Sequence, residues 1–410
     1  MDIGTLEVLY GTKAAAEAQM KRLQALKNEF ESKFGSAENV VFLSAPGRTE
    51  IAGNHTDHNH GCVLAASVDM DTVAAARING TDTVKLYSDM YSEPFTVELS
   101  SLEPVPAEKE TTNALIRGVA AALKNRGMKV GGFDACVTST VQRGSGLSSS
   151  AAFEVLLVKT FDTLFNGGNL PAQENARISR WAENNYFMKP CGLMDQMASA
   201  VGGMVYIDFK GGLAEVEAIR YDFSRKGLGV CVVSAGGDHG NLTNEYASIP
   251  AEMKQVARLL GGETLRDVED RIVPGIAQLK NKVPDRAILR ALHFADENAR
   301  VRRMAECLKN DDIDGFLNGV IESGESSWKL LQNLCVPGSS NQEMPLALEM
   351  SRRFLKGKGA WRIHGGGFAG TILAFVPLKD MDAYKTYMEA VFGEGSVKPL
   401  FIRPEGTVKL

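Results

Sequence analysis

The sequence has no Cys-x-x-Cys pair, and its cysteines are few and far apart. Six are present among 410 residues, at Cys62, Cys136, Cys191, Cys231, Cys307 and Cys335. The missing pair argues against a zinc ribbon or a redox dithiol, both of which need thiols close together. Scattered thiols are typical of small buried side chains in a reducing compartment, so we expect a cytoplasmic protein.

Long apolar runs and clustered basic residues are missing too. No run approaches the roughly 18 apolar residues that a membrane span needs, and the first residues lack a basic segment followed by an apolar one. Lysine and arginine number 45 against 50 acidic residues, which gives a net charge of −5. We therefore expect no export, no membrane and no nucleic-acid partner.

What the chain does contain is enough apolar sequence for a large core. Hydrophobic residues make up 44% of it and charged residues 23%, and its 41 glycines follow no triplet period, which excludes a disordered or collagen-like chain. The length predicts two or three domains. Because the pattern of elements changes near 215–225, we expect an N-terminal domain over 1–220 and a C-terminal domain over 221–410.

Hydrophobic periodicity predicts the main helices and strands. Helices are expected over 12–34, 151–165, 172–187, 284–309, 312–333, 343–356 and 380–392. Strands are expected at 40–43, 62–69, 72–77, 131–141 and 204–209, and as a pair over 361–377. The polar stretch 47–61 is expected to be a loop between strands.

A loop of small residues, Gly144 to Ser150, stands between a predicted strand and a predicted helix. Small residues let backbone N–H groups approach an anion, and the helix dipole favours negative charge, so the loop is a candidate phosphate site. It lacks the lysine of a Walker A loop and the third glycine of the dinucleotide fingerprint. A serine-rich helix cap explains the same residues equally well.

Charged and imidazole side chains gather in the polar stretch, at Arg48, Glu50, His55, Asp57, His58 and His60. The H-x-x-H-x-H spacing matches no standard zinc motif, which leaves zinc as a weak alternative. Paired donors and acceptors suit a polyhydroxylated ligand better.

Asp195 stands in an apolar segment, between Met194 and Met197. A carboxylate in such surroundings needs a partner, because an unpaired charge is costly to bury. Asp195 is therefore either a helix cap or satisfied core carboxylate, or a general base whose pKa is set by burial against a nearby cation.

The order of these segments resembles the signatures of a kinase superfamily. Residues 46–58 (Pro-Gly-Arg-Thr-Glu-Ile-Ala-Gly-Asn-His-Thr-Asp-His), 144–152 and 190–196 (Pro-Cys-Gly-Leu-Met-Asp-Gln) are followed by a glycine-rich segment at 365–370. Taken alone, that segment is a tight turn between strands. The succession is similar to the signatures of the galactokinase, homoserine, mevalonate and phosphomevalonate kinases, and most of all to the galactokinase family. The resemblance covers nearly the whole chain.

The resemblance implies a fold and a reaction. The fold would be a two-domain α/β (α+β) structure with a ferredoxin-like C-terminal half and the active site between the domains. The reaction would be the phosphorylation of galactose at its C1 hydroxyl, with ATP and Mg²⁺, as the first step of galactose catabolism. We expect a monomer whose partners are the sugar and ATP.

The resemblance also implies roles for individual residues. Asp195 would act on the acceptor hydroxyl, and Arg48 would hold Asp195 ionised. Mg²⁺ would be bound by Ser150 and Glu183. The ATP phosphates would lie on Gly144, Ser145, Gly146, Leu147, Ser148, Ser149 and Ser150, and the sugar on Asn54, His55, Thr56, Asp57, Gly192 and Tyr246.

Some residues depart from the galactokinase pattern. Glu50 stands where the pattern has asparagine, Asn54 where it has a sugar-facing glutamate, and Ser145 where it has a loop glycine. An amide at position 54 removes a charge that would repel a sugar acid, so a kinase for galacturonate or an amino sugar is one alternative. Another is a sugar- and nucleotide-binding sensor without turnover, which would be expected to lose Asp195.

Overall fold

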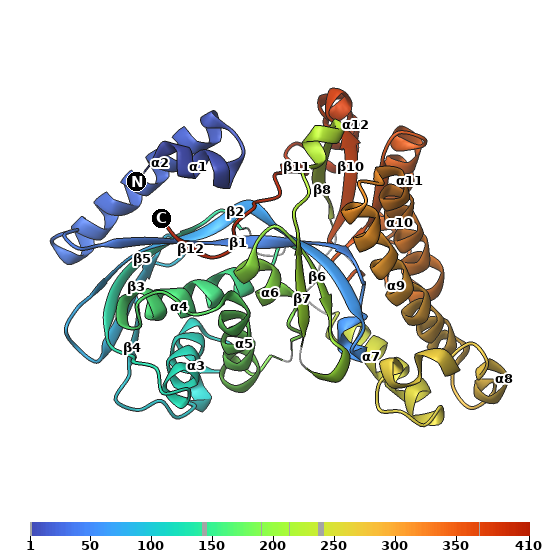
Figure 1. Ribbon diagram of the computed structural model, residues 1–410, viewed down its shortest axis with the longest axis horizontal. Helices are drawn as coiled ribbons and strands as arrows, with labels where there is room; N and C mark the ends of the chain where they lie inside the picture. Colours follow the sequence, from blue (N-terminus) through green and yellow to red (C-terminus); the bar gives the residue numbers. More distant parts are fainter. Residues whose placement is uncertain (1, 142–145, 190, 213, 237–241, 369) are drawn as a thin grey trace.

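The computed structural model describes residues 2–141, 146–189, 191–212, 214–236, 242–368 and 370–410. In these residues the strands form one eight-stranded and one four-stranded sheet. Helices pack against both sheets, and the two sheets meet near the middle of the molecule (Figure 1). None of the described helices is both long enough and apolar enough to span a bilayer.

The larger sheet comes almost entirely from the N-terminal half of the chain. Its strands are β1 (Val41–Ala52), β2 (Cys62–Ile78), β3 (Thr83–Ser88), β4 (Phe95–Glu98), β5 (Phe133–Ser139), β6 (Met204–Asp208), β7 (Glu215–Ile219) and β12 (Val408–Lys409). The main path runs β12-β1-β2-β5-β3-β4, and β6 and β7 extend from β2. β3 and β5 pair in parallel, whereas the other neighbours pair antiparallel.

Alternation along β2 sends its side chains into two cores. Val73 and Ala75 face one core with the N-terminal helices, and Ala74 and Ala76 face the other, as the two-residue period of a strand requires. Figure 1 shows these helices on opposite faces of the sheet. The helices of the first face are α1 (Ile3–Tyr10) and α2 (Lys13–Phe34), and those of the second are α3 (Thr112–Asn125), α4 (Ser149–Phe165), α5 (Ala172–Ala182) and α6 (Met194–Val201).

The smaller sheet lies in the C-terminal half. Its antiparallel strands are β8 (Leu228–Gly236), β9 (Ala360–His364), β10 (Gly370–Pro377) and β11 (Val397–Leu400). Their spatial order is β11-β8-β10-β9, or 4-1-3-2 in chain order, which is the order of the ferredoxin-like arrangement. The predicted ferredoxin-like half is confirmed.

Helices cover both faces of this smaller sheet. One face packs against α11 (Glu343–Leu355) and α12 (Met381–Phe392), and the other against α9 (Asp285–Lys309) and α10 (Ile313–Ser326). A separate core forms around α7 (Thr243–Leu259), α8 (Ile276–Leu279) and the start of α9. The four helices expected in this half between 284 and 392 are therefore present.

β1 is longer than its apolar residues predict. The strand expected at 40–43 continues to Ala52, so that only residues 53–61 of the polar stretch form a loop, and residues 43–52 are all buried. Pairing with β2 persists through two register shifts, and β2 itself joins the two segments expected at 62–69 and 72–77. The polar side chains of β1 find partners inside the protein, which hydrophobic alternation does not reveal.

The last residues of the chain return to the larger sheet. β12 pairs with β1 next to Leu43, and the fully buried Arg403 lies 3.3 Å from Asp71 on β2. Arg22 from α2 binds the same carboxylate at 2.5 Å. The N-terminal helices, the larger sheet and the C-terminal tail are therefore joined at the buried carboxylate of Asp71. The domain boundary expected between residues 220 and 221 stays a prediction.

We expect Asp71→Ala to lower the free energy of unfolding by roughly 3–5 kcal/mol, because it leaves Arg403 buried without its counter-charge. Urea unfolding of both proteins measures the change. Lys280→Met is the control, since it breaks an exposed ion pair with Asp285 and should leave stability near that of wild type. A loss as small as the control's would contradict the prediction.

Candidate active site

The predicted phosphate loop lies against β1. The backbone N–H of Arg48 donates to the carbonyl of Leu147 at 3.0 Å. A Cβ on Gly47 would lie 2.8 Å from that same carbonyl oxygen, so this close approach requires glycine. Residues 146–150 therefore come together with Arg48 at the start of α4. Gly144 and Ser145, also predicted to bind phosphate, lie outside the described residues.

An ion pair joins the two predicted catalytic residues. Arg48 Nε donates to Asp195 Oδ1 at 2.7 Å, and its Nη1 donates to the carbonyl of Gly146. The Ser148 hydroxyl donates to the other carboxylate oxygen. Ser148 holds the N-cap position of α4 at a φ of 57°, but its side chain makes no capping bond. The helix-cap interpretation of this serine is therefore replaced by a contact with Asp195.

The surroundings of Asp195 keep it ionised. Burial alone would raise the pKa of the carboxyl, but the Arg48 guanidinium and the hydrogen bond from Ser148 hold that pKa below its usual value. Its side chain retains 33% exposure, whereas that of Arg48 retains 8%. A charged carboxylate with one accessible side, held beside a phosphate loop, is suited to accept or orient a proton.

Three predicted sugar ligands contact successive carbonyls of the glycine-rich turn. The Asn54 amide donates to Gly365 at 2.7 Å, His55 Nε2 lies 2.9 Å from the oxygen of Gly366, and the Tyr246 hydroxyl donates to Gly367 at 2.8 Å. Asn54 and His55 follow β1, and Tyr246 lies on α7. The polar loop, the turn and α7 are thus fixed to one another.

Asn54 is fully buried, and the protein already satisfies its amide. Besides Gly365, its Nδ2 donates to Glu50 Oε1 at 2.9 Å, and its Oδ1 accepts from Asn333 at 2.6 Å. Glu50 in turn pairs with the buried Arg362 at 3.0 Å. Sugar binding by Asn54 stays a prediction, and a direct contact would require one of these partners to be exchanged.

Two further predicted sugar ligands, Asp57 and Gly192, lie side by side. A Cβ at Gly192 would overlap Asp57 Oδ2, so a larger residue would displace that carboxylate. Thr56 is different, because its buried hydroxyl donates to the carbonyls of Gly53 and Cys62 and closes the loop. Asp57 therefore lies against the segment that carries Asp195, whereas Thr56 holds the backbone.

A pair of buried carboxylates lies beside this site, and sequence analysis found only one of them. Gln196 Nε2 donates to Glu183 at 2.8 Å and to Glu154 at 3.0 Å. Glu154 is fully buried, and its Oε1 has no hydrogen-bond partner among the described residues. Burial and the neighbouring Glu183 raise the pKa of Glu154 well above its usual value. The sequence signal for Glu154 is that it is the single acidic residue within the apolar run 151–158.

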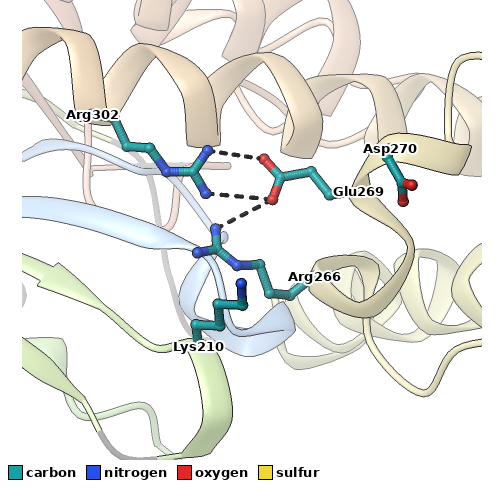
Figure 2. A pocket seen from close by; sticks show the side chains of 5 residues that line it. All are labelled: Lys210, Arg266, Glu269, Asp270 and Arg302. Atoms are coloured by element: carbon teal, nitrogen blue, oxygen red, sulfur yellow. Dashed lines mark hydrogen bonds and ion pairs between the residues drawn. The ribbon is translucent and has the colours of Figure 1, made fainter.

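A hollow of about 570 Å³ lies near the end of β6 (Figure 2). It is lined by Lys210, Arg266, Glu269, Asp270 and Arg302. Both arginines pair with Glu269, and Arg266 also pairs with Asp208, so these guanidinium charges are matched within the protein. None of the residues predicted for the site lines this hollow.

Comparisons with known proteins agree with this geometry. Residues 28–78 match a model described as the galactokinase galactose-binding signature, and residues 114–203 match the GHMP kinases N-terminal domain. The chain is 30% identical to the galactokinase of Streptomyces coelicolor over 90% of this chain and 92% of that protein. The chain belongs to the galactokinase family. It is 29% identical to the galactokinase of Pyrococcus furiosus, over 86% and 93% of the two chains.

Solved structures confirm the fold of this galactokinase-family chain. A crystal structure of Lactococcus lactis galactokinase complexed with galactose matches with a TM-score of 0.83 and 23% identity, covering 95% of this chain and all of that one. Methanococcus jannaschii mevalonate kinase matches with a TM-score of 0.64 and 14% identity, covering 89% and 99%. The two-domain fold expected from the sequence is thereby confirmed, and the protein is a sugar kinase by family.

We expect His55 to stay neutral down to about pH 5, with the proton on Nε2. Burial and the neighbouring His58 lower the pKa of His55 to about 4, and a neutral ring must donate to the Gly366 carbonyl. Because this folded-state pKa lies below the unfolded value, the contribution of His55 to stability is complete above pH 6.5 and is lost as the pH falls towards 4. Nitrogen-15 NMR of protein labelled at histidine measures the protonation state and tautomer of each ring. The signal that is missing from the spectrum of His55→Gln belongs to His55. Titration near pH 6.5 would contradict this.

Proposed function

We propose that this protein transfers the terminal phosphoryl group of ATP to the C1 hydroxyl of galactose. One observation carries the proposal: Arg48 and Ser148 hold the Asp195 carboxylate ionised, at the loop that begins α4. A kinase needs this combination, because the acceptor hydroxyl must lose its proton close to the bound phosphates.

Asp195 would accept or orient the proton of the acceptor hydroxyl. Both of its oxygens already have donors, Arg48 on one and Ser148 on the other, so the carboxylate cannot rotate freely. Part of its surface stays accessible, which leaves room for a hydroxyl to approach. Orientation and charge are therefore set before the sugar binds, which lowers the cost of reaching the transition state.

Arg48 would stabilise charge on the transferred group. Its Nε and Nη1 are used on Asp195 and Gly146, and no described residue accepts a hydrogen bond from its Nη2. A planar guanidinium can hold the carboxylate with one edge and offer the remaining donor to a phosphoryl oxygen. The phosphates themselves would lie on residues 146–150, where the 17-residue helix α4 directs its positive end.

The residues present fit a magnesium ion as well. Glu183 is buried, Ser150 lies in the first turn of α4, and Glu154 has a buried oxygen without a partner among the described residues, so the donors are the hard oxygens that Mg²⁺ prefers. Ser150 and Glu183 would hold the ion, and Gln196 orients Glu183. When bound, Mg²⁺ neutralises charge on the ATP phosphates.

The sugar would lie over the polar loop and the glycine-rich turn. Asp57 lies against Gly192, three residues before Asp195, and His55 and Tyr246 contact the turn, so we propose these four as sugar-facing positions. A sugar contact from Asn54 or Thr56 would require an exchange of the hydrogen bonds that they now make within the protein. Location in the cytoplasm and action as a monomer are also proposals, which rest on the scattered thiols and on family resemblance.

We expect Asp195→Ala to abolish phosphoryl transfer while ATP still binds, because the carboxylate acts on the acceptor and not on the nucleotide. Calorimetry with ATP and a coupled ADP assay separate the two effects. Asp195→Asn is the matched variant, since an amide still accepts from Ser148 but cannot take a proton. Turnover within about tenfold of wild type, little more than 1.4 kcal/mol of barrier, would contradict the proposal.

We expect Glu183→Gln to raise the Mg²⁺ concentration for half-maximal activity by at least about tenfold, and Ser150→Ala to raise it less, because only the first removes a charged ligand. Mg²⁺ titration at saturating ATP and sugar measures this. Glu174→Gln is the control, because Glu174 lies on α5, which ends just before Glu183, and pairs with arginines at the surface. An unchanged titration for Glu183→Gln would remove Glu183 from the metal site.

We expect galactose to be phosphorylated with a kcat/KM roughly tenfold or more above that of galacturonate, because the carboxylates of Asp57 and Asp195, each proposed to face the sugar, would repel a sugar acid. ATP consumption over a panel of hexoses, amino sugars and uronic acids provides the measurement. Good turnover of galacturonate with little turnover of galactose would replace galactose by the sugar acid in the proposed function.

A further inference from the structure

His364 is a buried histidine that the reaction described so far does not use. It ends β9 and is 2% exposed, and both of its ring nitrogens have partners. Nδ1 lies 2.8 Å from the hydroxyl of Thr371 on β10, and Nε2 lies 3.0 Å from the hydroxyl of Thr49 on β1. The ring therefore joins the smaller sheet to the larger one.

The backbone decides which nitrogen carries the proton. The N–H of Glu50 donates to Nε2 at 3.4 Å, so Nε2 must be an acceptor. Nδ1 then carries the hydrogen and donates to Thr371, and the Thr49 hydroxyl donates to Nε2. Burial, together with Arg48 and Arg362 as the charged groups that face the ring within the described part of the chain, holds the pKa of His364 well below its usual value. The ring is neutral and has one orientation.

The same ring packs against the phosphate loop. A Cβ on Gly146 would lie 2.9 Å from His364 Nδ1 and 2.8 Å from the Thr371 hydroxyl, so only glycine fits between them and α4. The carbonyl of Gly146 accepts from Arg48, which holds Asp195. Thr49, the second contact of the ring, is the next residue after Arg48. His364 thus contacts both Thr49, which follows Arg48 in the chain, and Gly146, whose carbonyl binds the Arg48 guanidinium.

We propose that His364 is a positioning residue for phosphoryl transfer, which sets Gly146 and Arg48 relative to each other from the C-terminal half of the protein. The inference rests on the proposed function, because it concerns how the catalytic pair is placed. Bridging both sheets, His364 gives the reacting groups their geometry only when the two halves are docked. It contacts no substrate in this role.

The test separates the two hydrogen bonds of the ring. His364→Leu removes both, His364→Gln restores an acceptor near Nε2 for Thr49 and Glu50, and Thr371→Val removes the partner of Nδ1 alone. Because a misplacement of about 1 Å can cost up to about 100-fold in rate, we expect His364→Leu to lower kcat by about 10- to 100-fold, with the KM for sugar changed less than about threefold. His364→Gln should recover at least about fivefold of that loss.

Thr160→Val is the control for Thr371→Val, because it removes an equally buried hydroxyl in the middle of α4. We expect Thr371→Val to lower kcat and Thr160→Val to leave it unchanged, at similar melting temperatures. If His364→Leu fails to fold, the kcat values of His364→Gln and Thr371→Val relative to wild type still test the inference. A kcat for Thr371→Val equal to that of the control, or no gain of His364→Gln over a folded His364→Leu, would overturn the inference. Wild-type protein without activity on any sugar would instead overturn the proposed function.

Discussion

Arg48 is a permanently charged side chain within a buried strand, and a buried guanidinium is stable only where oxygen atoms face it. Asp195 and the carbonyl of Gly146 supply those oxygens from two separate segments. Because β1 is paired with β2 on both sides of Arg48, the guanidinium position is set by the sheet. The phosphate loop and the start of α6 pack around this guanidinium, because each provides an oxygen that accepts a hydrogen bond from it. The arrangement of the site therefore depends on the hydrogen bonds that Arg48 needs.

The two halves of the protein are joined by buried polar groups that bond across the boundary between them. Glu50 pairs with Arg362, and Asn54 bonds the turn between β9 and β10. Such buried contacts add little net stability, since desolvation offsets much of the attraction, but breaking one of them is costly. The halves can therefore dock closely in the arrangement that satisfies these groups together, which is the arrangement that closes the site.

The sequence predicts the local parts of this structure. A strand, a small-residue loop and an apolar helix follow one another in 131–165, and their periodicity and composition suffice to identify them. It could not predict that β1 extends through 47–52, because the polar residues there are satisfied by groups more than 300 positions away, such as Arg362 and His364. Nor do the residues around Glu154 show that it lies beside Glu183, because Glu183 reaches it only when α4 and the end of α5 pack together.

Asn54 shows a further limit. Its place in the motif suggests a ligand for a sugar, yet its amide is bound by Glu50, Gly365 and Asn333, two of which lie in the distant half of the chain. The position of a residue in a motif identifies it as part of a site, because members of the family share the backbone structure there. It does not tell which residues face the ligand and which hold the others.

The C-terminal tail completes the N-terminal sheet, although it is the last part of the chain to be synthesised. β12 borders β1, and Arg403 provides a counter-charge for Asp71 inside the N-terminal sheet. A ribosome delivers the N-terminal half first, but that half has an open strand edge and an under-compensated buried acid until the tail arrives. Without the tail, Asp71 keeps Arg22 as a charged partner but lacks Arg403. The N-terminal sheet therefore gains its last strand and the second ion pair of Asp71 only after the entire ferredoxin-like half has been synthesised, and deletions at the C-terminus should destabilise the first half of the molecule.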